Sequence, residues 1–228
     1  MREEYTRDNY PSFGKKYAGE KAIISLTSWK ARIDTVSKTL YSLLKQCHGF
    51  HIVLVLSEEE FPKMMDEMPS SLKLFVKNNL IEVLWVYKNY KAFKKVLFTM
   101  DKYQNVPVIS ADDDCIYTCN YAQTLYNEWA KNKSKIVCYR KSTKNGICGP
   151  SSLYPPSTFN TLILEFKKLD VKKLPKYDDT EIYNWMKKHN IQSTYICEKF
   201  PCFFHDELEP LSGGIKKNKL WEKSQSFS

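Results

Sequence analysis

The sequence predicts an α/β fold with a mostly parallel central sheet flanked by helices. Short apolar runs rich in β-branched residues alternate with longer segments whose apolar residues recur at helical spacing. The short runs contain almost no polar residues, as expected for parallel strands that are buried on both faces. The chain has 228 residues, of which 43% are hydrophobic, so we expect a single domain over residues 1–228.

The first half of the chain is expected to form a doubly wound unit. Ser57 followed three residues later by Glu60 is the reciprocal capping pattern that opens a helix. Parallel strands joined by helices require right-handed crossovers, which gives the doubly wound topology. The strands are expected at 22–27, 51–56, 81–86 and 106–111, and the helices between them at 33–46, 58–68 and 92–103.

The second half is expected to add further helices and strands around a long loop. The segment 141–156 is rich in Gly, Ser and Pro and predicts a functional loop, after which Ser157 is expected to cap a helix. We expect the other helices at 121–132 and 181–189, and the strands at 135–140 and 193–198.

Charge and cysteine content limit the partners and the compartment. The net charge of +9 suggests an anionic partner, without choosing between nucleic acid, an acidic membrane and a phosphorylated small molecule. No apolar run approaches roughly 18 residues, and the N-terminus lacks the apolar core of a signal peptide. Seven cysteines without a CxxC pair indicate neither a disulfide framework nor a zinc site. We expect a cytoplasmic protein, whose lysine-rich segment 214–223 would suit peripheral contact with the inner face of a membrane.

Three consecutive acids, Asp112, Asp113 and Asp114, stand at the end of the fourth expected strand. Open sheets of this kind bind ligands beyond the carboxyl ends of their strands, although acids after a strand also serve as turn formers. In extended backbone, Asp112 and Asp114 would project to the same side, where a shared Mg²⁺ or Mn²⁺ would relieve their repulsion. Lys94 and Lys95, just upstream, would add positive charge for a phosphate. Neither a P-loop nor a GxGxxG fingerprint is present, so metal and side chains would have to hold a nucleotide diphosphate.

The segment ADDDCIY (111–117) resembles the Asp-x-Asp signature of glycosyltransferases with the GT-A fold. Four other segments resemble, in the same order, one bacterial group close to the family-two-like enzymes: ISLTSWKARIDTVSKTLYSLLKQ (24–46), KKVLF (94–98), SLYPPSTF (152–159) and YDDTEIYNWM (177–186). The resemblance covers roughly residues 21–200. It implies a Rossmann-like GT-A domain with a nucleotide-binding half at 21–119, an acceptor half at 120–210, and peripheral segments at 1–20 and about 212–228.

The resemblance also implies an activity. Such enzymes are metal-dependent glycosyltransferases, here a hexosyltransferase of polysaccharide biosynthesis. We expect a nucleotide-diphosphate sugar, with a UDP-sugar first, as the donor, Mn²⁺ or Mg²⁺ as the cofactor, and a glycan or lipid-linked acceptor, with inversion at the anomeric carbon. The alternatives are a sugar-phosphate nucleotidyltransferase, which usually carries a glycine-rich loop that this sequence lacks, and a basic nucleic-acid-binding protein, whose polyanion the acidic triplet would repel.

On the donor side, the resemblance assigns roles to nine positions. Thr27, Ser28 and Arg32 would line the nucleotide pocket. Lys95 and Lys94 would steady the donor, although either could be an ordinary exposed helical lysine. Asp112 would lie near the ribose, Asp113 would support it, and Asp114 would bind the metal directly. His205 would complete the metal shell, unless it is simply a packed histidine beside aromatic residues.

On the acceptor side, the sequence offers a second acidic pair. Transfer with inversion needs a base that takes the proton of the acceptor hydroxyl. Asp178 and Asp179 stand before a helix, where one of them can serve as the N-cap, and their resemblance to the Glu-Asp position of the family favours Asp179 as the base, with Asp178 as the alternative. Tyr154 and Pro155 would border the sugar pocket, although prolines before a helix can merely fix its entry.

Overall fold

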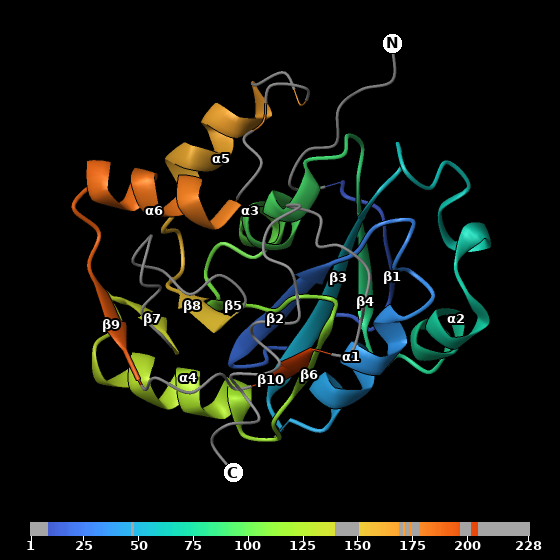
Figure 1. Ribbon diagram of the computed structural model, residues 1–228, viewed down its shortest axis with the longest axis horizontal. Coiled ribbons are helices and arrows are strands. Elements are labelled where there is room, and N and C mark those ends of the chain that lie inside the picture. The colour runs from blue at the N-terminus through green and yellow to red at the C-terminus, as the bar shows by residue number, and fades with distance from the viewer. Residues whose placement is uncertain are drawn as a thin grey trace.

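A mixed sheet of eight strands forms the centre of the molecule and is flanked by helices on both faces (Figure 1). The computed structural model describes residues 9–46, 48–139, 151–168, 171, 174, 178–196 and 202–204. The strand order is β1-β4-β3-β2-β5-β8-β7-β9, and β10 pairs with β6 in a separate two-stranded sheet. The α/β fold predicted from the sequence is confirmed.

The elements follow one another in the order shown by the colours of Figure 1. The strands are β1 (Ser12–Gly14), β2 (Ala22–Thr27), β3 (Phe50–Ser57), β4 (Glu82–Val86), β5 (Val108–Ser110), β6 (Cys115–Tyr117), β7 (Ile136–Cys138), β8 (Ser152–Tyr154), β9 (Ser193–Tyr195) and β10 (Cys202–Phe204). The helices are α1 (Val36–Leu44), η1 (Met64–Glu67), α2 (Ser70–Lys77), η2 (Lys91–Phe93), α3 (Lys94–Lys102), α4 (Tyr121–Lys131), α5 (Asn160–Lys167) and α6 (Asp178–Lys188), with η marking 3₁₀ turns.

The four central strands β4, β3, β2 and β5 are parallel, as predicted. Their carboxyl ends therefore meet at one edge of the sheet, which is where such sheets bind ligands. The strands β1 and β8 run antiparallel to their neighbours β4 and β5. All residues of β2 and β3 are buried, which explains why these runs are so uniformly apolar.

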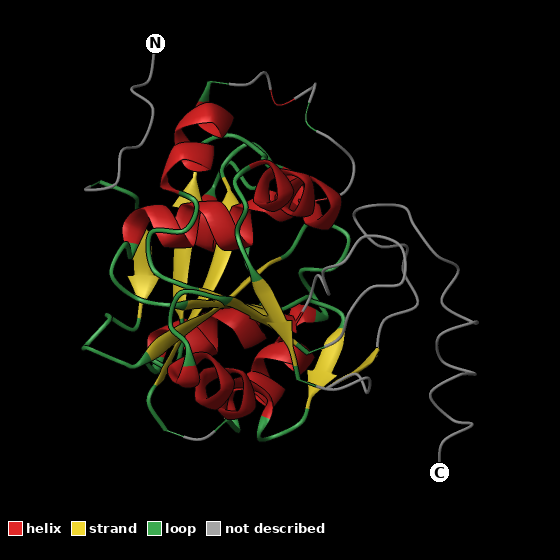
Figure 2. Cartoon of the chain, turned by 90° about the vertical axis from the view of Figure 1, so that its left-hand side faces the viewer, coloured by secondary structure: helices red, strands yellow, loops and turns green. Residues whose placement is uncertain are grey.

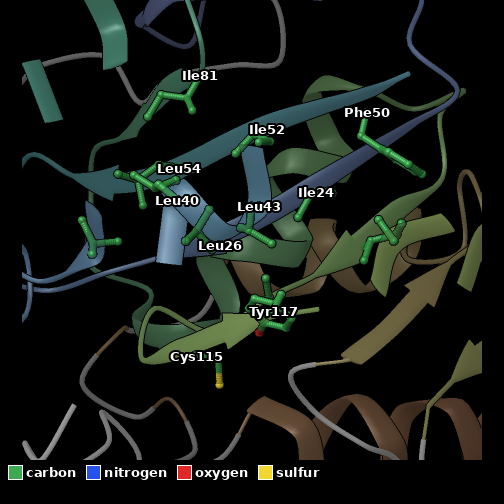
Figure 3. Close-up of a cluster of buried hydrophobic side chains, with 14 of the residues drawn as sticks. Ile24, Leu26, Leu40, Leu43, Phe50, Ile52, Leu54, Ile81, Cys115 and Tyr117 are labelled. Carbon is green, nitrogen blue, oxygen red and sulfur yellow. The ribbon is translucent and has the colours of Figure 1, made fainter. Parts of the chain in front are cut away.

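Side chains alternate between two apolar cores, one on each face of the sheet. Ile24 and Leu26 of β2 pack with Leu40 and Leu43 of α1 on one face (Figure 3). The helices α1, α2 and α4 cover this face. Ile23 of β2 points to the opposite face, where α3, α5 and α6 supply the apolar partners. Figure 2 shows the helices lying on both sides of the strands. Each fully buried aliphatic side chain contributes roughly 1.5–3 kcal/mol, so the two cores fix the position of the carboxyl edge.

Three local expectations were wrong: the helix at 58–68, the loop at 141–156 and the helix cap at Ser157. Residues 58–68 do not form one helix: Ser57 Oγ does contact Glu60 Oε2, at 3.0 Å, but only a turn and the 3₁₀ helix η1 follow. Pro62 explains the difference, because proline disfavours helical backbone at the residue before it. The helix α2, which follows Pro69, was not expected.

The loop predicted at 141–156 contains strand β8, which lies between β5 and β7. Leu153 and Tyr154 enter opposite cores, so these two residues complete the sheet. Ser157 does not cap α5. It has a positive φ of 61° and its Oγ donates to the carbonyl oxygen of Gln104 at 3.1 Å, while α5 begins at Asn160 after Phe159.

Candidate active site

The end of β2 places two small polar side chains at the carboxyl edge of the sheet. Thr27 Oγ1 donates to the carbonyl oxygen of Val55 in β3 at 2.7 Å, and Ser28 Oγ donates to Asp113 Oδ2 at 2.6 Å. Both residues are buried. Their hydroxyl groups therefore fasten the end of β2 to β3 and to the acidic triplet, and the nucleotide contacts predicted for them remain a prediction.

Arg32 joins the last two acids of the triplet. Its guanidinium Nη1 lies 2.8 Å from Asp113 Oδ1 and 3.2 Å from Asp114 Oδ2, and all three side chains are at most 7% exposed. Burial raises the pKa of Asp113, against the opposing effects of Arg32 and the Ser28 hydroxyl. The structure thus gives Arg32 the role of counter-ion to two enclosed carboxylates.

Asp112 points to a different partner. The expected alternation along extended backbone does not apply, because β5 ends at Ser110 and residues 113 and 114 lie in a turn. Asp112 Oδ1 lies 2.8 Å from Lys95 Nζ, and its side chain is 31% exposed, the highest exposure in the triplet. Asp112 is therefore the carboxylate of the triplet that a ligand can reach most easily.

Lys95 connects the acidic turn at 112–114 with the acidic pair at 178–179. Its Nζ also lies 3.2 Å from Asp178 Oδ2 at the start of α6. Burial alone would lower the pKa of Lys95, but the carboxylates of Asp112, Asp178 and Asp179 raise it well above its ordinary value. The ammonium group is therefore a permanent cation between the end of β5 and the N-terminus of α6.

Asp178 and Asp179 are the first two residues of α6 rather than a pair preceding it. Acids are favoured in the first turn of a helix because of the helix dipole. Burial and the neighbouring Asp178 raise the pKa of Asp179 well above its ordinary value, although Lys95 opposes this shift. A carboxyl group with a raised pKa is a stronger proton acceptor once ionised, which suits a general base.

Lys94 points away from this group. Its Nζ lies 2.9 Å from Glu60 Oε2 and 2.8 Å from Asn89 Oδ1, and the residue is fully buried. Burial lowers the pKa of Lys94, and Glu60 opposes this effect. Lys94 thus ties the segments that follow β3 and β4 to the first turn of α3, and donor contact at Lys94 remains a prediction.

The residues predicted to border the sugar pocket lie in and after β8. Tyr154 is 1% exposed, and its ring packs against Phe159 at a centroid distance of 5.1 Å. Burial and the nearby Asp179 raise the pKa of the Tyr154 phenol well above its ordinary value, which places Tyr154 near the candidate base. Pro155 is also buried. The predicted metal ligand His205 lies outside the described residues.

Three residues that hold the backbone of the acidic turn were not predicted from the sequence. Thr39 of α1, Tyr117 of β6 and Tyr121 of α4 each make a hydrogen bond to the main chain between Ser110 and Asp113. The position of Thr39 four residues before Leu43 on the expected helix, and the position of two tyrosines just after the triplet, were the available signals.

The fit of a divalent cation can be judged from the donor groups. Among the described residues, no three His, Cys, Asp or Glu side chains are grouped so that they could hold a metal ion. A Mg²⁺ or Mn²⁺ ion bound through one or two carboxylates and substrate phosphates needs fewer protein ligands. Asp112 suits that arrangement, with Asp114 behind it against Arg32. The residues therefore fit a cation shared with a diphosphate rather than an all-protein metal site.

This chain shares its fold with glycosyltransferases of known structure. It is similar to the mannosyltransferase PcManGT of Pyrobaculum calidifontis, solved with GDP-Man and Mn²⁺ (TM-score 0.58, 9% identity, 85% of this chain and 59% of that chain). It is also similar to S. aureus TarS 1-349, solved with UDP-GlcNAc (0.56, 11%, 89% and 64%), and to GlyE of Streptococcus pneumoniae TIGR4 (0.51, 14%, 78% and 45%).

Structural similarity at this level of sequence identity shows a common fold and nothing finer. The chain spans about half to two thirds of the length of these structures. No protein-family model and no curated protein matches the sequence. Within the described residues, no helix is both long enough and apolar enough to cross a membrane.

Proposed function

We propose that this protein transfers a sugar from a nucleotide-diphosphate sugar to an acceptor hydroxyl, with inversion at the anomeric carbon. The observation that carries the proposal is the position of the Lys95 ammonium between Asp112, at the end of β5, and Asp178, at the start of α6. An acid suited to the donor and an acid pair suited to the acceptor thus share one cation at the carboxyl edge of a parallel sheet.

The donor diphosphate would lie against the Asp112 and Lys95 end of this group. The Lys95 ammonium would stabilise the negative charge that develops on the departing nucleoside diphosphate. Asp113, held by Arg32 and Ser28, would keep the turn in place behind the donor. Thr27, Ser28 and Lys94 would shape the nucleotide pocket through the segments that they fasten.

Asp179 would take the proton of the acceptor hydroxyl as that oxygen attacks the anomeric carbon. The raised pKa of Asp179 favours this proton transfer, and Asp178 would hold Lys95 beside the Asp179 carboxyl group. Tyr154 and Pro155, in and after β8, would form the neighbouring wall of the sugar pocket.

Mn²⁺ or Mg²⁺ would be held by Asp112 and Asp114, with His205 as a third ligand. Such a cation neutralises the leaving diphosphate when it is bound. We propose a UDP-sugar as the first donor to examine, a hexosyl group as the transferred sugar, and a glycan or lipid-linked acceptor of polysaccharide biosynthesis.

A thermal-shift panel tests the proposal. The protein would be melted with nucleoside diphosphates and nucleotide sugars, with and without Mn²⁺, because a ligand that binds the native state raises Tm. We expect the matching nucleotide sugar to raise Tm, more so with Mn²⁺. A panel without any shift would contradict donor binding. Incubation with a sugar phosphate and a nucleoside triphosphate provides the control for nucleotidyl transfer, since that reaction releases pyrophosphate.

An Asp179→Asn variant tests the base. Transfer to the acceptor should fall by about 10²–10⁴-fold, while the thermal shift caused by the donor persists. Asp66→Asn, in η1 outside the site, is the matched control and should retain wild-type activity. An active Asp179→Asn variant would place the base elsewhere.

A further inference from the structure

Side chains from three other elements hold the backbone of the acidic turn. The Tyr121 hydroxyl in α4 donates to the carbonyl oxygen of Ser110 at 2.5 Å, and the Asp112 amide donates to the Tyr117 hydroxyl at 2.7 Å. Thr39 Oγ1 in α1 donates to the carbonyl oxygen of Asp113 at 2.9 Å. Three successive parts of the turn are thus bound by α4, β6 and α1.

These hydrogen bonds begin at the end of β5, where the ladder of the central sheet stops. The amide of Ala111 donates to the carbonyl oxygen of Ser25 in β2, and β5 has already ended at Ser110. From Asp112 onward, the direction of the main chain is set by contacts outside the central sheet. The direction of the Asp112 carboxylate depends on the same contacts.

Tyr117 is itself firmly placed. It is 4% exposed, belongs to the apolar cluster beneath α1 (Figure 3), and its ring lies 4.4 Å from that of Tyr121, centroid to centroid. Its amide donates to Ser42 Oγ of α1 at 3.0 Å. Tyr117 is therefore held through both its ring and its main chain, so its hydroxyl can keep the Asp112 amide in a fixed position.

We infer that the Tyr117 hydroxyl is a positioning group that directs the Asp112 carboxylate toward Lys95 and the donor. This role rests on the proposed function, because it requires that Asp112 face a nucleotide-diphosphate sugar. Tyr117 would touch no substrate atom. Its removal would weaken donor binding only through the misplacement of Asp112.

The test substitutes Tyr117→Phe, which removes one hydroxyl and keeps the ring. With the nucleotide sugar selected by the thermal-shift panel, the donor KM should rise by about 10-fold, while kcat changes little. In the nucleotide-free protein, hydrogen exchange at the Asp112 amide, followed by NMR, should accelerate by about 5-fold. Tyr126→Phe is the matched control, because Tyr126 packs against the same core but does not contact the turn; it should leave both quantities unchanged.

A double-mutant cycle separates positioning from a general loss of structure. If Tyr117 acts through Asp112, Tyr117→Phe should add no loss in kcat/KM to an Asp112→Asn variant. Additive losses, or unchanged exchange at Asp112 in Tyr117→Phe, would overturn the inference. A wild-type protein that neither binds nor turns over any nucleotide sugar would instead overturn the proposed function, whatever the exchange rates show.

Discussion

Single residues determine the charge balance of the candidate site, and Arg32 faces the densest part of it. Arg32→Met would leave the enclosed carboxylates of Asp113 and Asp114 without their counter-ion. Removing one partner of a buried ion pair costs about 3–5 kcal/mol. We expect a loss of stability of this size in urea unfolding. Lys38→Met, at an exposed position on α1, is the control and should change stability by less than about 0.5 kcal/mol.

Substitution of Asp179 is expected to stabilise the protein, in contrast to substitution of Arg32. The raised pKa of Asp179 means that the folded protein retains the proton at pH values where the unfolded chain releases it, so folding becomes less favourable as pH rises through this range. Asp179→Asn removes this penalty and should raise Tm at pH 7 by roughly 3 °C. The difference should vanish below about pH 3, where both states hold the proton. A variant that melts below wild type at pH 7 would contradict the raised pKa.

The sequence predicted which acids and lysines would be important better than it predicted their partners. Asp112, Lys95 and Asp178 come together because parallel strands and following helices bring their ends to one edge. The pairing of Asp113 and Asp114 with Arg32 was not predicted, because alternation assumes extended backbone and the chain turns at this point. Which cation a carboxylate meets depends on the turn, and an apolar pattern carries no information about it.

At the scale of elements, the three longest strands were predicted closely, whereas four of the seven described three-residue strands, β1, β6, β8 and β10, were not predicted. The strand β2 has the bounds that the sequence predicts, β3 extends one residue further at each end, and β4 begins one residue later. The strand β8 was assigned to a loop, because three residues next to prolines show no recognisable period. The helix α2 has only eight residues, which gave a short and weak helical pattern.

The strand β1 allows a matched pair of substitutions. Gly14 has φ +88°, and a Cβ there would lie 2.4 Å from the carbonyl oxygen of Ile81, which also accepts a hydrogen bond from Lys15. Gly19 has φ +92° with no atom within 4 Å of such a Cβ. Gly19→Ala should cost about 1 kcal/mol, for backbone strain alone, and Gly14→Ala roughly 2–4 kcal/mol, because the edge strand must also shift. Equal losses of stability for the two variants in urea unfolding would show that β1 shifts without a further energetic cost.

For the whole molecule, the sequence defined the layers because both faces of the sheet must be covered. Side chains alternate in direction along β2, so Ile23 and Ile24 enter different cores, and helices of matching apolar spacing cover each face. The order of strands beyond β5 was not predicted, since it depends on contacts between segments far apart in the sequence. The proposed acceptor side of the site was therefore the less predictable half.

Resistance of the whole molecule to acid should depend on Glu82, the first residue of β4, which lies at the end of the strand opposite the carboxyl edge. Glu82 is 1% exposed and contacts His51 Nε2 at 2.7 Å and Lys102 Nζ at 2.6 Å, and it accepts a hydrogen bond from the Tyr103 hydroxyl. Burial alone would raise the pKa of Glu82, but His51, Lys102 and Tyr103 lower it from 4.5 to about 2. The folded state thus binds the Glu82 proton more weakly than the unfolded chain does.

The stability that Glu82 contributes is fully present above pH 4.5 and is lost as pH falls toward 2. Glu82→Gln should therefore destabilise the protein by on the order of 3 kcal/mol at pH 7, and by much less at about pH 3, in paired urea titrations. Glu165→Gln, exposed on α5, is the control and should match wild type at both pH values. A Glu82→Gln deficit that stays constant with pH would mean that the lost side-chain contacts, and not the carboxylate charge, stabilise this end of the sheet.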